Sequence, residues 1–370
     1  MITKREEKVK KIVLSGGGTG GSVSPLLAVA KELERCKGNN NYKFFWLGTY
    51  KGLEKEMVKK AGIKFRAICS GKLRRYFSFK NFIDPFFIII GFFQAIAILI
   101  IWRPNLVMSA GSFISVPVAW AAWILCVPIL VHQQDVRPGL ANKLIAPFAR
   151  IITVTFKESL KDYGKKAVWT GNPAQLSITN YQLSIKEIFD KFNLKIGLPI
   201  VLVVGGGTGA MAINELVWQN LDELTKFCQV IHICGKNKKT QKHKNTKTNY
   251  YLFDFLEPKK MAEVLQIADV AVSRCGLGLL TELSYLGKPA ILIPIPDTHQ
   301  EDNAQIFKAK EAAIVLSQNK LISKELAGNI KKLLDDEALR SKLRNNIRNV
   351  IKRGANKEIV NIIKRITHNV

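Results

Sequence analysis

The sequence predicts an α/β protein made of two domains of related build, each with a parallel sheet. An internal repeat is the first reason. KIVLSGGGTGGSVSPLLAVAKEL, from Lys11, and PIVLVVGGGTGAMAINELVWQNL, from Pro199, share one order of apolar run, glycine loop and helical apolar pattern. The second reason is that short β-branched runs alternate with helix-length segments through both halves, as in βαβ units. A chain of 370 residues suits two domains of ordinary size.

The apolar runs mark the expected strands. They are at 11–15, 43–48, 105–109, 128–132 and 151–155 in the first half, and at 199–204, 229–234, 268–272 and 290–294 in the second. The turn-rich stretch at 170–173 precedes a segment without sharp periodicity, so we place the linker near 171–178. We assign 1–172 to the N-terminal domain and 173–352 to the C-terminal domain, and we expect a last helix at 353–370 to pack back on the first domain.

The net charge of the chain indicates which classes of partner it binds. There are 56 Lys and Arg against 29 Asp and Glu, and the formal net charge of +27 points to nucleic acid, anionic lipid or phosphorylated substrates. The six cysteines contain no C-x-x-C pair, and no two of the five histidines lie three to five residues apart. We therefore expect neither a disulfide framework nor a metal site. The first apolar run has the length of a strand, which does not indicate export.

One apolar segment fits a soluble domain poorly. Residues 86–102 (FFIIIGFFQAIAILIIW) contain one polar side chain, Gln94, and their length is at the lower limit for a membrane span. Basic and aromatic residues precede the segment, which suits a helix lying in a membrane interface. The alternative is a buried helix beside a solvated basic loop. The residues that we expect to meet the membrane are Arg74, Arg75, Phe77, Phe79, Phe86 and Phe87.

The two glycine loops predict phosphate binding. The loops at 16–21 and 205–210 match G-x-G-x-x-G and its variant ending in alanine, and each lies between a strand and a helix, where backbone N–H groups favour an anion. A nicotinamide dinucleotide site usually adds an acid at the end of the second strand. The strand ends at 47–49 (Leu-Gly-Thr) and 233–236 (Ile-Cys-Gly-Lys) supply none, and no G-x-x-x-x-G-K-[ST] motif occurs. Dehydrogenase and P-loop ATPase functions are therefore disfavoured.

The block at 273–307, SRCGLGLLTELSYLGKPAILIPIPDTHQEDNAQIF, links these loops to a known family. It resembles the nucleotide-sugar signature of glycosyltransferases with the GT-B fold. In detail it is similar to that of the bacterial MurG-type N-acetylglucosaminyltransferases of glycosyltransferase family 28. Four further stretches agree in the same order: GGGTGGSVSP at 16–25, HQQDVRPGLANK at 132–143, TGNP at 170–173 and GGGTGAMAIN at 205–214. The resemblance extends over nearly the whole chain.

The resemblance implies two Rossmann-like domains with parallel sheets facing a central cleft. It implies inverting transfer of GlcNAc from UDP-GlcNAc to the 4-hydroxyl of undecaprenyl-pyrophosphoryl-MurNAc-pentapeptide, which converts lipid I into lipid II in peptidoglycan synthesis. It further implies a peripheral enzyme on the cytoplasmic face of the cell membrane, working at an anionic surface and beside other cell-wall synthesis proteins, with no cofactor and no required metal. No nucleic-acid partner is expected, because no RNP, KH or zinc motif occurs.

Residue by residue, the resemblance assigns the donor site to the C-terminal domain. Glu282 should accept hydrogen bonds from the ribose hydroxyls, and Gln300 and Asn303 should contact the GlcNAc hydroxyls. The other expected donor contacts are Gly206, Gly207, Thr208, Gly209, Arg274 and Gly276. Structural roles stay open for Glu282, Gln300 and Asn303. Glu282 is alternatively an acid at a helix N-terminus, and Gln300 and Asn303 are alternatively helix caps.

The acceptor site and the catalytic groups are assigned to the N-terminal domain. The catalytic candidates are Ser22, His132 and Asp135. Ser22 stands where the family commonly has histidine, and serine needs activation to act as a base at neutral pH. The family's H-E-Q-N is His132-Gln133-Gln134-Asp135 here, so the glutamate is lost and a carboxylate appears two residues on. Because the family's histidine is also missing, Asp135 becomes the candidate base or acceptor-orienting group. His132 ends an apolar run, where a core histidine is equally expected. The expected acceptor pyrophosphate contacts are Gly18, Thr19, Gly20, Gly21 and Asn142.

Two other functions stay open. The departures from the family pattern also suit a divergent GT-B transferase with another polyprenyl or glycolipid acceptor. A nucleotide-sugar epimerase shares the GT-B fold but needs no lipid acceptor and no exposed apolar helix.

Overall fold

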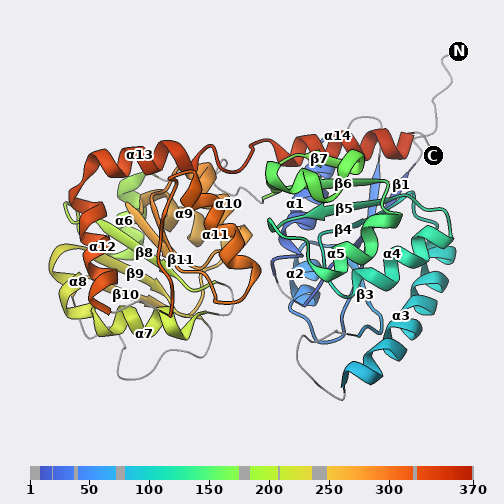
Figure 1. Cartoon of the computed structure of the whole chain (residues 1–370), viewed down its shortest axis with the longest axis horizontal. Coiled ribbons are helices and arrows are strands. Elements are labelled where there is room, and N and C mark those ends of the chain that lie inside the picture. The colour runs from blue at the N-terminus through green and yellow to red at the C-terminus, as the bar shows by residue number, and fades with distance from the viewer. Residues whose placement is uncertain are drawn as a thin grey trace, which may run out of the picture. The chain divides into compact units, whose positions relative to one another are not determined.

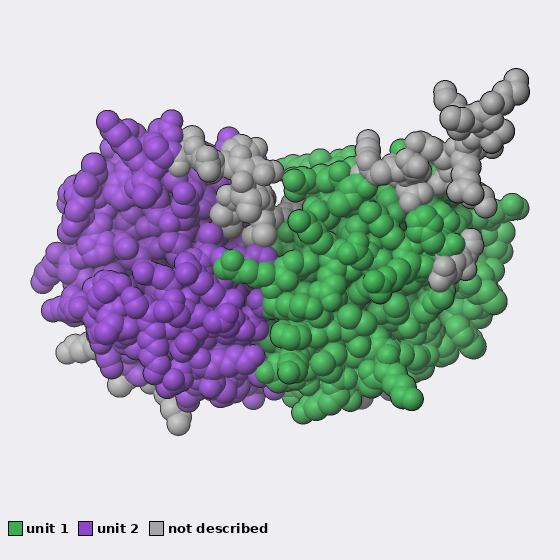
Figure 2. Space-filling view, turned by 90° about the horizontal axis from the view of Figure 1, so that it is seen from above, with its two compact units in different colours: residues 1–175, 352–370 green, residues 176–351 purple. Residues whose placement is uncertain are grey.

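The chain forms two compact units in a computed structural model that describes residues 9–18, 20–36, 41–71, 80–174, 184–206, 209–235, 248–319 and 323–368. Unit 1 is Met1–Gln175 with Lys352–Val370, and unit 2 is Leu176–Ile351 (Figure 2). Each unit is a parallel sheet covered by helices (Figure 1). The predicted fold class of two Rossmann-like α/β domains is confirmed.

The sheet of unit 1 has the strand order β3-β2-β1-β4-β5-β6-β7, and all its pairings are parallel. Its strands are β1 (Lys10–Ser15), β2 (Tyr42–Gly48), β3 (Lys64–Ala67), β4 (Leu106–Ser109), β5 (Ile129–Gln133), β6 (Ile151–Val154) and β7 (Ala167–Trp169). Its helices are α1 (Ser24–Arg35), α2 (Glu54–Lys60), α3 (Lys80–Trp102), α4 (Ser115–Ile124), α5 (Leu140–Ile145) and α14 (Ala355–His368), with 3-10 turns η1 (Ala146–Phe148), η2 (Lys157–Asp162) and η3 (Gly164–Lys166).

The sheet of unit 2 has the order β10-β9-β8-β11-β12-β13, again with parallel pairings. Its strands are β8 (Ile200–Val204), β9 (Gln229–Ile233), β10 (Tyr250–Phe253), β11 (Val270–Ser273), β12 (Ala290–Leu292) and β13 (Ile314–Val315). Its helices are α6 (Ile185–Phe192), α7 (Met211–Gln219), α8 (Leu221–Phe227), α9 (Pro258–Ile267), α10 (Leu277–Leu286), α11 (His299–Ala309), α12 (Ser323–Asp335) and α13 (Glu337–Ile347).

Four strands were not expected from the sequence: β3, β7, β10 and β13. All four lie at the outer edges of the two sheets. They are two to four residues long, and in β3 half-buried and exposed positions alternate. Central strands are buried on both faces and read as continuous apolar runs, whereas short edge strands give no such signal.

The central strands of unit 1 supply two cores, one on each face of the sheet. Ile12 and Leu14 of β1 pack in one core, and Val13 between them packs in the other. The first core includes α1 and the apolar side chains of α14, such as Ile359 and Ile363. The second includes α3 and α4. This double burial fixes β1 at the centre of the sheet, where the first glycine loop begins.

Helix α3 is apolar but largely uncovered. Its segment Ile83–Trp102 is long and apolar enough to cross a membrane by length and composition, and only 22% of its most apolar window is buried. Gly91 and Ala95 lie on its buried side, and the Oε1 atom of Gln94 accepts a hydrogen bond from the Cys69 N–H at 2.8 Å. Exposed apolar side chains on α3 and the end of α4 form what we term the α3–α4 apolar surface: Ile83, Phe86, Phe87, Ile89, Ile90, Phe93, Ile100, Ile101, Trp123 and Ile124.

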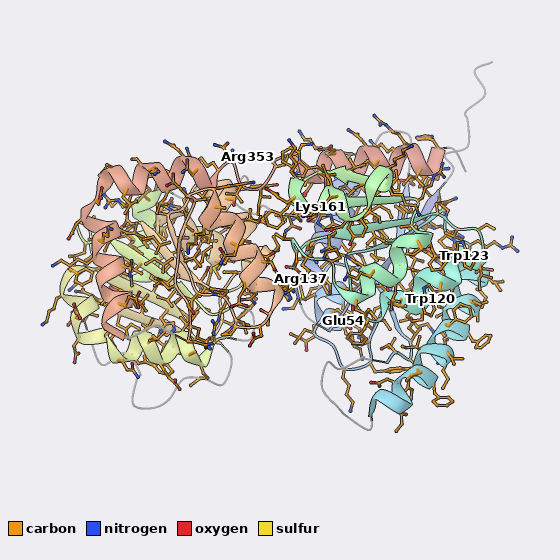
Figure 3. All side chains as sticks on the ribbon, viewed as in Figure 1. Glu54, Trp120, Trp123, Arg137, Lys161 and Arg353 are labelled. Atoms are coloured by element: carbon orange, nitrogen blue, oxygen red, sulfur yellow. The ribbon has the colours of Figure 1, made fainter. Side chains whose placement is uncertain are left out.

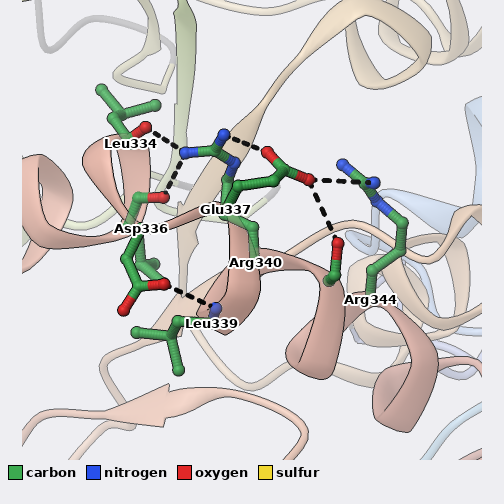
Figure 4. A network of polar contacts seen from close by, with 8 residues as sticks. Leu334, Asp336, Glu337, Leu339, Arg340 and Arg344 are labelled. Carbon is green, nitrogen blue, oxygen red and sulfur yellow. Dashed lines mark hydrogen bonds and ion pairs between the residues drawn. The ribbon is translucent and has the colours of Figure 1, made fainter.

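A polar network closes the junction between α12 and α13 in unit 2 (Figure 4). Asp336 caps α13 by accepting from the Leu339 N–H at 2.8 Å. Arg340 donates to the Leu333 carbonyl at 2.7 Å and pairs with Glu337, so it ties the last turn of α12 to the first turn of α13. The hydrogen bond from Arg340 is the main reason that the pKa of Glu337 lies below its ordinary value.

Candidate functional site

The strand order of each sheet locates its ligand-binding edge. In unit 1 the chain moves outward in one direction from β1 and in the other from β4, and in unit 2 the same reversal occurs between β8 and β11. Ligands of open α/β sheets bind beyond the carboxyl ends of the strands at such a reversal. The first glycine loop follows β1, the second follows β8, and the Ser273–Gly276 turn follows β11. The predicted phosphate loops therefore stand at the two expected positions.

The first glycine loop is held from two sides. The Gly17 carbonyl accepts from the hydroxyls of Ser22 at 3.2 Å and Ser112 at 2.9 Å. The Gly18 N–H donates to the Oε2 atom of Glu54 at 3.1 Å, with Gly18 at φ +85°. Among the described residues, nothing accepts from the amides of Gly20 and Gly21, so these two N–H groups remain for an anion, whereas that of Gly18 does not. Thr19 lies outside the described residues.

The catalytic role expected for Ser22 does not fit this geometry. Its side chain is 5% exposed, and its hydroxyl donates to the Gly17 carbonyl. A hydroxyl that gives its proton to the backbone holds the loop and is not poised to take a proton from a substrate.

His132 is a core histidine, so its predicted catalytic role is also not supported. The side chain is 0% exposed on β5. Its Nε2 lies 2.9 Å from Asn172 Oδ1, which only accepts, so Nε2 carries the proton, and Nδ1 accepts from the Thr153 hydroxyl at 3.0 Å. Burial lowers the pKa of His132 to about 4. The neutral ring links β5 to β6 and to the TGNP turn.

The loop after β5 places Asp135 at the same carboxyl edge. Gln133 organises the loop, because its amide donates to the carbonyls of Asp135 at 2.7 Å and Arg137 at 3.3 Å. The Gln133 Oε1 atom accepts from Asn142 at 2.5 Å and from the Tyr163 hydroxyl at 2.9 Å. Asn142 is 4% exposed, and its Oδ1 atom is buried without a partner among the described residues. Asn142 thus supports the Asp135 loop, and Asp135 itself is half-buried.

The second glycine loop turns tightly against β9. Gly206 and Gly209 have φ of +91° and +72°, and the Gly209 N–H donates to the Gly206 carbonyl at 2.9 Å. A Cβ at Gly209 would overlap the Cys234 carbonyl, so only glycine allows this approach. Asn214 of α7, the last residue of the GGGTGAMAIN stretch, donates to the same carbonyl at 2.9 Å, and the motif did not predict this buried contact. Gly207 and Thr208 lie outside the described residues.

The motif after β11 is held by side chains that the sequence suggested for ligand contact. Arg274 is 8% exposed and donates to the carbonyls of Ile293 at 2.9 Å and Pro294 at 3.1 Å, while burial lowers its pKa. Asn303 is 0% exposed and donates to the Cys275 carbonyl at 3.2 Å. The direct ligand contacts expected for Arg274 and Asn303 stay predictions, and the buried Nε of Arg274 has no partner among the described residues. Both side chains fix the Ser273–Gly276 turn.

Gln300 joins that turn to the loop after β12. Its Oε1 atom accepts from the N–H groups of Cys275 and Ile295, both at 3.3 Å. Its Nε2 has no partner among the described residues, which leaves the two N–H donors of the amide for a ligand. Thr298 is the N-cap of α11, so the alternative role of Gln300 as the cap is not needed. Gly276 begins α10 as its N-cap, with open space where a Cβ would stand.

Glu282 is the exceptional carboxylate of unit 2. It lies at the sixth position of α10, beyond the first turn, so the alternative of a helix N-terminal acid does not hold. No hydrogen bond or ion pair joins it to any residue in the described ranges, although the side chain is half-buried. Burial raises its pKa to about 7 from an ordinary 4.5. An unpaired, desolvated carboxylate beside a ligand-binding edge is a candidate ligand contact.

The described residues contain no cluster of three or more His, Cys, Asp or Glu side chains that would hold a metal ion. The predicted membrane residues Phe86 and Phe87 are 68% and 43% exposed on α3. Arg74, Arg75, Phe77 and Phe79 lie outside the described residues.

Two protein-family models match most of the chain. The model for the glycosyltransferase family 28 N-terminal domain matches residues 12–154, and that for the glycosyltransferase family 28 C-terminal domain matches 200–365. A relative from Clostridium kluyveri, named UDP-N-acetylglucosamine--N-acetylmuramyl-(pentapeptide) pyrophosphoryl-undecaprenol N-acetylglucosamine transferase, is 38% identical over 88% of this chain and 91% of its own length.

Solved structures agree on the fold. MurG from Acinetobacter baumannii has a TM-score of 0.73 at 24% identity, with 96% of this chain and 99% of that chain covered. UDP-GlcNAc 2-epimerase from Neisseria meningitidis, bound to UDP-GlcNAc, has a TM-score of 0.70 at 14% identity, with 97% and 100% covered. Identities this low show a shared fold and no more.

Proposed function

The chain belongs to glycosyltransferase family 28, and we propose that it transfers GlcNAc from UDP-GlcNAc to the 4-hydroxyl of the MurNAc sugar in undecaprenyl-pyrophosphoryl-MurNAc-pentapeptide. The product is a β-1,4-linked lipid II, and the released product is UDP. The naming of the Clostridium kluyveri relative supports this substrate pair. The observation that carries the proposal is Glu282, a carboxylate with no partner in the described part of the chain and a pKa of about 7, beside a glycine-rich edge that favours anions.

The donor binds to unit 2 in this proposal. The two Glu282 oxygens accept from the two adjacent ribose hydroxyls. The diphosphate lies against the amides of the second glycine loop (Gly206, Gly207 and Thr208) and the Gly276 turn at the start of α10. The Gly209 N–H is taken by the Gly206 carbonyl, so Gly209 shapes the loop instead. The free Nε2 of Gln300 meets a GlcNAc hydroxyl, while Arg274 and Asn303 hold the turn in place.

The acceptor binds to unit 1. The amides of Gly20 and Gly21, with Thr19, receive its pyrophosphate. Asp135 takes the proton from the 4-hydroxyl as that oxygen attacks C1 of GlcNAc and the bond from C1 to the UDP oxygen breaks. Preorganised N–H groups stabilise the charge that develops on the leaving UDP, so the transfer proceeds without a metal or another cofactor.

The α3–α4 apolar surface attaches the enzyme to the cytoplasmic face of the membrane, where the lipid-linked acceptor lies. Phe86, Phe93 and Ile101 are 68%, 63% and 80% exposed, which is unusual for a water-facing helix. A net charge of +27 favours an anionic lipid surface. Attachment places unit 1 next to the headgroup that carries the acceptor sugar.

The test supplies labelled UDP-GlcNAc with lipid I, with a different polyprenyl-linked sugar, and with no acceptor. The proposal predicts label in lipid II and equimolar UDP with lipid I only. Transfer only to the other acceptor would favour a divergent transferase. Conversion of the donor sugar without acceptor would favour an epimerase. Glu282→Ala is the control, and it should lose the reaction.

A further inference from the structure

A buried carboxylate lies beneath the first glycine loop. Glu54, the first residue of α2 (Figure 3), is 0% exposed. Its Oε2 atom accepts from the Gly18 N–H at 3.1 Å. Its Oε1 atom accepts from the Thr49 N–H at 2.8 Å and from the Thr49 hydroxyl. One side chain thus joins the loop after β1, the turn after β2 and the start of α2.

Glycines around Glu54 make room for it. A Cβ added to either Gly17 or Gly52 would overlap the carboxylate oxygens, and one at Gly48 would lie 3.2 Å from the Glu54 Cγ atom. Gly52 is not in the left-handed region, so its backbone alone does not require glycine. The space that it leaves is occupied by the carboxylate.

No other common side chain satisfies these contacts. The three donors surround a group that only accepts, and no ion pair joins Glu54 to a described residue. Glutamine would direct its NH₂ group at one of these donors and leave that N–H unsatisfied. Aspartate is one methylene shorter and cannot reach both Gly18 and Thr49 from the same backbone position.

Glu54 and two serines hold part of the first glycine loop, and the amides of Gly20 and Gly21 have no acceptor among the described residues. Glu54 takes the Gly18 N–H, while Ser22 and Ser112 take the Gly17 carbonyl. The amides of Gly20 and Gly21 come two and three residues after Gly18. Such preorganisation lets N–H groups meet an anion without reordering.

We propose that Glu54 is a positioning residue that holds the first glycine loop in the conformation that receives the acceptor's pyrophosphate. The substrate part of this inference rests on the function proposed above. Glu54 does not contact the substrate and acts only through the loop.

The test compares Glu54→Gln and Gly52→Ala with a matched control. Gly52→Ala leaves the carboxylate in the chain but displaces it. The control is Asn105→Ala, which removes the hydrogen bond from the Lys11 N–H to Asn105 Oδ1, 2.8 Å long, at the opposite end of β1. Amide hydrogen exchange of peptides covering 15–25 is measured in the free protein. KM and kcat are measured for UDP-GlcNAc and for lipid I, and the melting temperature is recorded.

Both test variants should exchange the loop amides at least about 10-fold faster and lose about 100-fold in kcat/KM for lipid I, with KM for UDP-GlcNAc within about twofold of wild type. Asn105→Ala should lower the melting temperature without either change. Unchanged loop exchange in Glu54→Gln and Gly52→Ala would overturn the proposal. Equal losses of kcat/KM for UDP-GlcNAc and for lipid I in all three variants would also overturn it. If the wild-type protein transferred no GlcNAc, the proposed function would be refuted. Faster loop exchange in Glu54→Gln and Gly52→Ala would still show that Glu54 holds the loop.

Discussion

Glu282→Gln should stabilise unit 2 while it weakens donor binding. The carboxylate is half-buried and has no partner among the described residues, and its pKa of about 7 records the cost of holding its charge there. Glutamine keeps the shape and removes the charge. A residue that lowers the stability of the ligand-free protein at neutral pH is retained when it contributes to ligand binding.

The magnitude follows from the pKa. The folded value of about 7 exceeds the ordinary 4.5, so between these values the folded state binds more protons than the unfolded state. The free energy of unfolding therefore falls as pH rises through this window, and the full cost is present above pH 7. At 1.36 kcal/mol per pKa unit, the cost is about 3 kcal/mol. Below pH 4.5 the variant and the wild type should be equally stable.

The free energy of unfolding of unit 2 is measured at pH 5 and pH 8 by urea unfolding, with hydrogen exchange of the β8 and β11 amides as the probe. Glu215→Gln, on the exposed face of α7, is the matched control and should change stability little. Equilibrium binding should show at least a tenfold weaker Kd for UDP-GlcNAc in Glu282→Gln, about 1.4 kcal/mol, at pH 8. If Glu282→Gln were no more stable than wild type at pH 8, the buried charge would not destabilise unit 2, and if it bound donor like wild type, Glu282 would not contact the donor.

Three further predictions concern unit 1. Asp135→Asn should lower kcat at least about 100-fold with donor Kd unchanged, and a full rate would exclude Asp135 as the base. Because burial holds the pKa of His132 near 4, below its ordinary 6.5, unit 1 should lose up to about 3 kcal/mol of stability as pH falls from 6.5 to 4. His132→Gln should flatten this acid limb in urea titrations, and an unchanged limb would contradict the assignment. Phe86→Ser with Phe93→Ser should reduce co-sedimentation with anionic vesicles several-fold, and equal sedimentation would mean that α3 does not meet lipid.

The central architecture could be predicted because it depends on strong local signals. The central strands are continuous apolar runs, and both glycine loops follow such a strand directly. The edge strands β3 and β13 could not be predicted, because their formation depends on pairing with a neighbour rather than on their own pattern.

The site was predictable in position and less so in role. A motif gives a residue's place in the sequence but not whether its polar atoms face a ligand or the backbone. His132, Arg274 and Asn303 turned inward, each to satisfy buried groups of its own unit. Glu54 gave no motif at all. The second strand has no acid at its end in the sequence, but Glu54, five residues after Thr49, folds back onto that strand end and accepts from the Thr49 N–H.

The most direct test of the proposed reaction is a single-turnover experiment with labelled UDP-GlcNAc and lipid I in detergent. Lipid II and UDP should form together in equal amounts, without added metal and in the presence of a chelator, and Glu282→Ala should form neither. UDP release without labelled lipid, or lipid II formed at the wild-type rate by Glu282→Ala, would contradict the proposed reaction.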